Sequence, residues 1–313
     1  MTASTRHVLC AVDYSAASRS ALRWAALAAK QARARLTVLT VTDPLLVEAM
    51  NACSADDWTV SERVELRAFC RESLGTEQPF DAEIRAGRAA DEIHAAAASM
   101  RADLLVMGSH GLTGIHKVFF GSTAERVLRE TDIPVLVTPG DLQGQHGPAT
   151  LASAVRRILV PIDLTGASAA LVRLGAALGQ AIDVPVLVAH AIEPLHVPAR
   201  WQSRVPSLHL EARDRAEAAM HRVVEEAGGD AESMVLIGDA ADAIINVANV
   251  RAAGLILMGL QQSGLGRVGV IAYRVLCRSQ VPVLALPRAA AARLASEIAV
   301  PVPAVACSLM TSS

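Results

Sequence analysis

The stretch "HVLCAVDYSAAS" (His7–Ser18) decides the fold, because a related stretch, "RILVPIDLTGAS" (Arg157–Ser168), returns about 150 residues later. Three further landmarks recur in the same order. They are "GRAADEI" (Gly87–Ile93) with "GDAADAI" (Gly238–Ile244), "DLLVMG" (Asp103–Gly108) with "GLILMG" (Gly254–Gly259), and "DIPVLVTP" (Asp132–Pro139) with "QVPVLALP" (Gln280–Pro287). The recurrence indicates two copies of one unit in tandem, which we call the first copy and the second copy.

Each copy alternates short apolar runs with helical patterns. In the first copy the runs that predict buried strands are Val8–Val12, Leu36–Val41, Asp81–Arg85, Leu104–Met107 and Val135–Val137. Helices are expected after a cap at Ser15 and over Thr59–Leu74, Ala90–Met100 and Ser122–Glu130. This alternation predicts an α/β fold of two doubly wound domains, each a parallel sheet with helices on both faces.

The repeat also places the domain boundaries. We expect a first domain over residues 1–140, a linker over 141–154 and a second domain over 155–288. The linker begins with "DLQGQHGPAT" (Asp141–Thr150), which is rich in glycine and polar residues. Residues 289–313 match nothing in the first copy, so we expect a peripheral or disordered tail.

The composition narrows the class of protein. Of 313 residues, 52% are hydrophobic and the formal net charge is −2, a balance that argues for packed cores and against a nucleic-acid partner. No apolar stretch approaches the ~20 residues of a membrane helix. The five cysteines are scattered without a CxxC pair, and the histidines form no HxxxH pair. We expect a cytoplasmic protein without a bound structural metal.

The stretch "MGSHGLTGIHKVFFGSTAERV" (Met107–Val127) leaves the fourth strand with four glycines before a helix begins at Ser122. Ligands of parallel sheets lie beyond the carboxyl ends of the strands, and glycines let backbone N–H groups approach an anion there. The start of the helix favours a phosphate as well. Alternatively, Ser122 and Glu125 form a capping box and bind nothing, although a cap needs none of the additional glycines.

The spacing Gly108-x2-Gly111-x9-Gly121-Ser122 resembles the nucleotide-binding signature of the universal stress protein family. "AVDYS" (Ala11–Ser15), "GRAADEI", "DLLVMGSHG" and "AERVLRETDIPVLVTP" match other landmarks of that family, and the resemblance covers nearly all of Met1–Arg288 as two tandem domains. It implies a five-stranded parallel sheet in the order 3-2-1-4-5 in each domain.

The resemblance also implies an ATP site in the first domain. Asp13 would hold the sugar, the backbone of Val41 would meet the adenine, and the glycine loop with Gly121-Ser122-Thr123 would hold the triphosphate. A Mg²⁺ ion would screen the phosphates, because Lys117 and Arg126 are the only nearby cations. The complete set of nucleotide-binding residues expected is Ala11, Asp13, Ser15, Val41, Met107, Gly108, Ser109, His110, Gly111, Gly114, Gly121, Ser122 and Thr123.

The second copy departs from this pattern. After Gly259 it reads "LQQSGLGRVGVIAY", which is shorter, and Val270 stands where Ser122 stood. Asp163 is retained, but the phosphate loop is degenerate. We therefore expect one nucleotide per chain, held by the first domain.

We expect the protein to be a regulatory module of the stress response that binds ATP and has no catalytic residues. The alternatives are a slow ATP hydrolase or AMP-forming enzyme, and a scaffold or carrier of a small apolar ligand that binds no nucleotide. The last strands, Ile133–Pro139 and Val281–Pro287, are apolar edges that invite pairing. We expect them to pair within the chain as an internal pseudo-dimer, and a homodimer of chains is left open.

Overall fold

The computed structural model describes residues 6–53, 57–75, 78–109, 121–140, 150–194, 205–229, 231–260 and 268–299. Within these residues the first copy has the strands β1 His7–Val12, β2 Arg35–Thr42, β3 Asp81–Ala86, β4 Leu104–Gly108 and β5 Val135–Thr138. Its helices are α1 Ala16–Ala32, α2 Pro44–Cys53, α3 Trp58–Leu74, α4 Ala89–Ser99 and α5 Ser122–Glu130.

The second copy repeats this order after a single helical turn, α6 Leu151–Ala154. Its strands are β6 Ile158–Pro161, β7 Val186–Ile192, β8 Glu232–Ile237, β9 Leu255–Leu260 and β10 Val283–Pro287. Its helices are α7 Ser168–Ile182, α8 Val205–Glu226, α9 Ala240–Val250, α10 Val270–Arg278 and α11 Arg288–Ala299.

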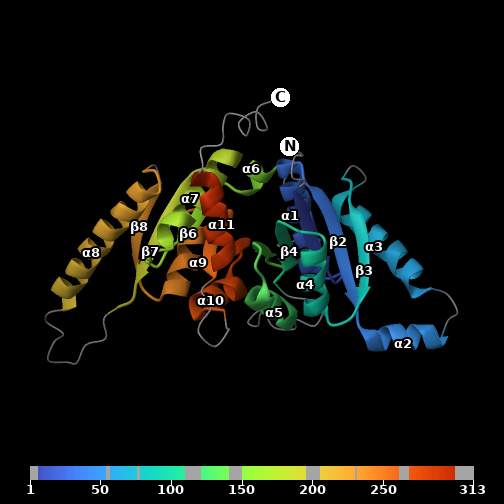
Figure 1. Ribbon diagram of the computed structural model, residues 1–313. Coiled ribbons are helices and arrows are strands. Elements are labelled where there is room, and N and C mark those ends of the chain that lie inside the picture. The colour runs from blue at the N-terminus through green and yellow to red at the C-terminus, as the bar shows by residue number, and fades with distance from the viewer. Residues whose placement is uncertain are drawn as a thin grey trace.

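All of these strands form one sheet, in the order β3-β2-β1-β4-β5-β10-β9-β6-β7-β8. Neighbouring strands are parallel within each copy, so each copy has the expected order 3-2-1-4-5. One core lies under α4, α5, α9 and α10, and the other lies under α1, α3, α7, α8 and α11. Figure 1 shows the two copies as two arms that meet at the centre of the molecule.

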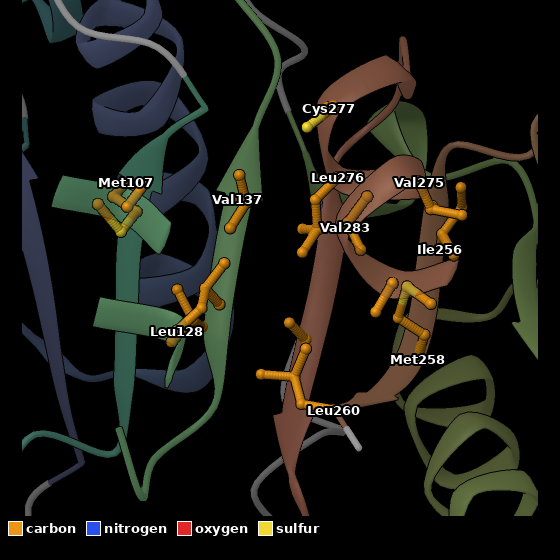
Figure 2. Close-up of a cluster of buried hydrophobic side chains, with 14 of the residues drawn as sticks. Met107, Leu128, Val137, Ile256, Met258, Leu260, Val275, Leu276, Cys277 and Val283 are labelled. Carbon is orange, nitrogen blue, oxygen red and sulfur yellow. The ribbon is translucent and has the colours of Figure 1, made fainter. Parts of the chain in front are cut away.

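The two copies join through their last strands, as the sequence predicts. β5 and β10 run antiparallel, with Val137 opposite Val283, Leu136 opposite Leu284 and Val135 opposite Ala285. The core on the α5 and α10 side continues across this junction, and Figure 2 shows its side chains on both strands and on both helices. The internal pseudo-dimer is therefore built on a continuous sheet.

Two segments differ from expectation. Helix α2 is not predicted from the sequence, and none of its residues is buried. Part of the expected tail forms α11, which packs on α7 through small side chains, with Ala290 and Ala295 buried. The rest of the tail lies outside the described residues.

Among the described helices, none has the length and apolar character needed to cross a membrane.

Candidate functional site

The turn after β1 lies at the carboxyl edge of the first copy and is held in a strained conformation. Tyr14 has a left-handed backbone, with φ of 64°, which is uncommon outside glycine. Its hydroxyl donates a hydrogen bond of 2.5 Å to Glu62, and its ring meets Phe69 edge to face at 5.3 Å. Burial, together with the hydrogen bond to Glu62, raises the pKa of Tyr14 far above its usual value. The phenol thus stays protonated and fastens the turn to α3.

Asp13, the residue before Tyr14, has its carboxylate oriented by two serines. Its Oδ1 atom accepts hydrogen bonds from the Ser18 hydroxyl at 2.5 Å and from the Ser15 backbone N–H at 3.2 Å. The backbone N–H of Asp13 in turn donates to Ser18 Oγ at 2.9 Å. Ser18 is buried and therefore holds the side chain of Asp13 in one rotamer. Ser18 was not among the residues expected in the site, although the Asp-x4-Ser spacing recurs as Asp163 and Ser168.

The end of β4 and the start of α5 are tied together beside this turn. The backbone N–H of Ser109 donates to Thr138 at the end of β5, and the carbonyl of Ser109 accepts from the N–H of Gly121 at 3.1 Å. Ser109 and Thr138 are both buried. Both ends of the glycine loop are therefore anchored to the sheet edge. Three loop residues expected in the site, His110, Gly111 and Gly114, lie outside the described residues.

Gly108 has a structural role that the sequence analysis did not predict. A Cβ atom at this position would lie 2.7 Å from Cβ of Ala17 and 2.9 Å from the carbonyl carbon of Ala17. The end of β4 therefore touches the first turn of α1, and only glycine fits between them. This glycine is explained by packing, whether or not a ligand approaches the backbone.

Helix α5 begins without a side-chain cap. Its N-cap residue is Gly121, which has no side chain to bond the first N–H groups, and Ser122 is already the first helical residue. The alternative interpretation, a capping box of Ser122 and Glu125, is therefore wrong, because the helix starts one residue earlier than that motif requires. The first turn of α5 presents its N–H groups at the sheet edge, which is the arrangement that favours an anion.

This difference in capping predicts different costs for two serine substitutions. Ser15 is the N-cap of α1 and accepts a hydrogen bond from the N–H of Ser18, so Ser15→Ala should lower the free energy of unfolding by about 1 kcal/mol. Ser122→Ala removes no cap and should change it by less than about 0.5 kcal/mol. Urea denaturation of both variants measures the difference. An equal loss for both would show that Ser122 does cap α5.

The other expected site residues lie around the same edge. Ala11 and Met107 are buried within β1 and β4. The last residue pair between β1 and β2 is Val12 with Thr40. The next residues along the two strands, Asp13 and Val41, therefore lie side by side, and the side chain of Val41 is half-buried. Thr123 follows Ser122 in the first turn of α5 and is partly exposed.

Arg126, which we expected near the phosphates, is paired with carboxylates instead. It contacts Asp91 on α4 at 2.5 Å and Glu130 on its own helix at 3.2 Å. The matching residue of the second copy, Arg274, contacts Asp239 and Asp242, both at the start of α9. This arginine therefore joins two helices in each copy. Lys117 lies outside the described residues.

The second copy has the same turn after its first strand, β6, but its helix α10 begins with apolar residues. Leu164 has φ of 60° like Tyr14, and Asp163 accepts hydrogen bonds from Thr165 and Ser168. Burial alone would raise the pKa of Asp163, but these bonds outweigh it and hold the pKa below its usual value. At the start of α10, Val270 is 75% exposed and Ile271 is 42% exposed, where the first copy has Ser122 and Thr123. The start of α10 is uncapped like that of α5 and keeps its backbone N–H groups, but it offers no side-chain hydroxyl to an anion.

The part of the chain that the structure describes holds no group of three or more histidine, cysteine, aspartate or glutamate side chains suited to a metal ion. The polar groups gathered at the carboxyl edge of the first copy are instead one oriented carboxylate and the backbone N–H groups of a helix start. This combination can bind a hydroxyl-bearing anion such as a nucleotide.

Comparison with curated proteins yields short local matches. A universal stress protein of Methanocaldococcus jannaschii is 46% identical over 55 residues, which make up 18% of this chain and 32% of that protein. Two further universal stress proteins, from Thermus aquaticus and Mycolicibacterium smegmatis, are matched over 54% and 50% of their lengths. The chain thus spans about a third to about half of the length of the curated relatives it matches.

Solved structures match nearly the whole chain. A functionally unknown protein from Pseudomonas aeruginosa is 17% identical with a TM-score of 0.64, over 95% of this chain and 98% of that chain. A universal stress protein from Archaeoglobus fulgidus is 21% identical with a TM-score of 0.58, over 90% of this chain and 96% of that chain. These two likenesses show a shared fold. The model of the universal stress protein family matches residues 4–139 and again residues 154–287. The chain therefore belongs to the universal stress protein family, with two family units in tandem.

Proposed function

We propose that the first domain, residues 1–140, binds one ATP molecule at its carboxyl edge and that the second domain, residues 155–288, binds none. The observation that carries this proposal is the start of α5, which is uncapped like that of α10 but carries the hydroxyls of Ser122 and Thr123 where α10 carries Val270 and Ile271. The N–H of the α5 N-cap, Gly121, donates to Ser109 at the end of β4, and β4 neighbours β1, which leads to the oriented carboxylate of Asp13. A phosphate there would gain several backbone hydrogen bonds and the favourable end of the helix dipole.

Each part of the nucleotide has a matching part of the site in this proposal. The carboxylate of Asp13 would accept hydrogen bonds from the ribose hydroxyls, because Ser15 and Ser18 already fix its orientation. The backbone of Val41 would contact the adenine. Gly121, Ser122 and Thr123, together with the loop that includes His110, Gly111 and Gly114, would hold the phosphates. A Mg²⁺ ion would accompany them, since Arg126 is paired with carboxylates.

We further propose that ATP binding serves regulation within a cytoplasmic stress response and that hydrolysis is weak or nil. Efficient hydrolysis needs a residue that positions or deprotonates water. Near the proposed ribose, Tyr14 stays protonated because of its raised pKa, and Asp13 is held by two serines. In this proposal both groups lie at the ribose, so neither is placed to activate water at the phosphates.

The test compares two equivalent glycines. Gly121 is the N-cap of α5 with φ of −60° and ψ of 136°, and Gly269 is the N-cap of α10 with φ of −55° and ψ of 140°. Both conformations suit any residue, so valine should leave both helices folded. Gly121→Val would place a branched side chain among the phosphate ligands and should weaken ATP binding at least about 100-fold, which corresponds to about 2.7 kcal/mol. Gly269→Val should leave the affinity unchanged.

Titration calorimetry with Mg²⁺–ATP measures the affinity and the number of sites, which we expect to be one per chain. Nucleotide released by denaturing the purified protein identifies the ligand that it carries. Two equivalent sites per chain would overturn the assignment to the first domain. Unchanged binding in Gly121→Val, or no binding by the parent, would overturn the site itself.

A further inference from the structure

Helices α4 and α5 of the first copy pack side by side next to the proposed nucleotide site (Figure 1). Each helix connects two parallel strands of the sheet, so both helices begin at the carboxyl edge. An ion pair joins them, because Arg126 of α5 contacts Asp91 of α4 at 2.5 Å. This ion pair shows which positions of the two helices lie opposite each other.

One turn nearer the carboxyl edge, Arg88 of α4 lies opposite Ser122 of α5. Arg88 is the N-cap of α4 and comes three residues before Asp91, whereas Ser122 comes four residues before Arg126. Residues three or four apart share one face of a helix. Arg88 and Ser122 are therefore neighbours, and Ser122 is one of the residues proposed to hold the phosphates.

The backbone on the other side of Arg88 also belongs to the site. The N–H of Gly87 donates to the carbonyl of Thr42 at 3.1 Å, and Thr42 follows Val41, the residue proposed to meet the adenine. Arg88 thus stands between the two ends of the proposed nucleotide.

The stability of α4 does not explain an arginine at this position. The side chain of Arg88 is exposed, makes no hydrogen bond to cap the helix, and contacts no carboxylate among the described residues. Arginine is not a favoured N-cap, and the dipole of a helix disfavours a cation at its start.

The second copy has a different residue at the same position. Asp239 is the N-cap of α9, accepts a hydrogen bond from the N–H of Asp242 at 3.1 Å, and contacts Arg274 of α10 at 2.7 Å. A side chain at this position therefore reaches the neighbouring helix. The residue that stabilises the helix start is found in the copy with Val270 in place of Ser122, and the unpaired arginine is found in the copy with the serine.

We propose that Arg88 binds the phosphates of the nucleotide, an inference that rests on the proposed function of the first domain. The sequence pointed only to Lys117 and Arg126 as nearby cations, and Arg126 is paired with carboxylates. The fold brings Arg88 to the same place from a distant part of the chain. Its guanidinium can donate two parallel hydrogen bonds to phosphate oxygens, which an ammonium group cannot do.

The test is titration calorimetry of the full chain with Mg²⁺–ATP and with adenosine. Arg88→Gln should weaken ATP binding about tenfold, which corresponds to about 1.4 kcal/mol, and higher salt should reduce the difference from the parent. The affinity for adenosine should stay unchanged, because adenosine carries no phosphate.

Arg88→Asp introduces the residue of the second copy and separates binding from stability. It reverses the charge and should weaken ATP binding more than Arg88→Gln does. It should also raise the thermal midpoint of the nucleotide-free protein, because aspartate can cap α4 and contact Arg126 as Asp239 contacts Arg274. Weaker binding by a more stable protein does not arise from unfolding.

Arg101→Gln is the matched control. Arg101 is an exposed arginine between α4 and β4, at the opposite edge of the sheet, so this variant should bind ATP like the parent. Failure of the parent to bind ATP would overturn the proposed function together with this role of Arg88. If the parent binds ATP and Arg88→Gln binds it within twofold as well, only the role of Arg88 is overturned. An equal loss in Arg101→Gln, or an equal loss of adenosine affinity in Arg88→Gln, would overturn that role too.

Discussion

Replacing Gly108 by alanine is expected to lower the free energy of unfolding by about 2–3 kcal/mol, the range of an overpacked core site. The added Cβ would lie 2.7 Å from Cβ of Ala17 and 2.9 Å from its carbonyl carbon. Ala17 is buried in the first turn of α1, so relief requires the helix to move away from β4. Urea denaturation, with the slope compared between variants, measures the loss.

The second copy supplies the matched control. Gly259 occupies the same position at the end of its fourth strand, and a Cβ there would meet nothing within 4 Å. Gly259→Ala should therefore change the free energy of unfolding by less than about 0.5 kcal/mol. Equal effects at the two glycines would show that contact with α1 is not what requires glycine at Gly108.

This contrast shows why a glycine-rich motif is hard to interpret from sequence. Glycine lets a backbone approach a ligand, and it also lets two backbones approach each other. The amino-acid sequence of the Met107–Val127 stretch does not distinguish these two roles of glycine. The structure assigns Gly108 to packing against Ala17, while Gly121 has ordinary backbone angles and stands at an uncapped helix start. Gly121 therefore remains the sharper test of ligand binding.

The strands were predictable because buried parallel strands appear in the sequence as continuous apolar runs, whereas their order was expected only from the family resemblance. All six residues of β1 are buried, for example, and its run is visible in both copies. Helix α2 was not predictable in this way, because Leu45 and Leu46 are exposed and the helix has no buried face.

The details of the site depended on contacts between distant residues. The sequence does not decide whether the N-cap of α5 is Gly121 or Ser122, because glycine and serine are both common N-cap residues. The bond from Ser18 to Asp13 needs the turn at Tyr14, and that turn depends on Glu62 and Phe69 in another helix.

The largest loss of stability is expected from a charge at the junction of the two copies. Val137 on β5 lies opposite Val283 on β10, and both are 2% exposed. Figure 2 shows them on neighbouring strands, with Leu128 and Leu276 of the covering helices nearby. Val137→Lys would bury an ammonium group with no partner among the described side chains of this core, all of which are apolar. The expected loss is about 4 kcal/mol.

The same substitution at an exposed valine gives the control. Val270 is 75% exposed, so Val270→Lys should change the free energy of unfolding by less than about 0.5 kcal/mol.

Val137→Lys should also separate the two halves of the sheet, because a lysine at this position disrupts the packing on both β5 and β10. Each half would then expose an apolar edge strand, which promotes association between chains. Urea denaturation should show two transitions in place of one, and light scattering should show larger species. A variant that unfolds in one step with the parent's stability and mass would mean that the β5–β10 pairing does not hold the two copies together.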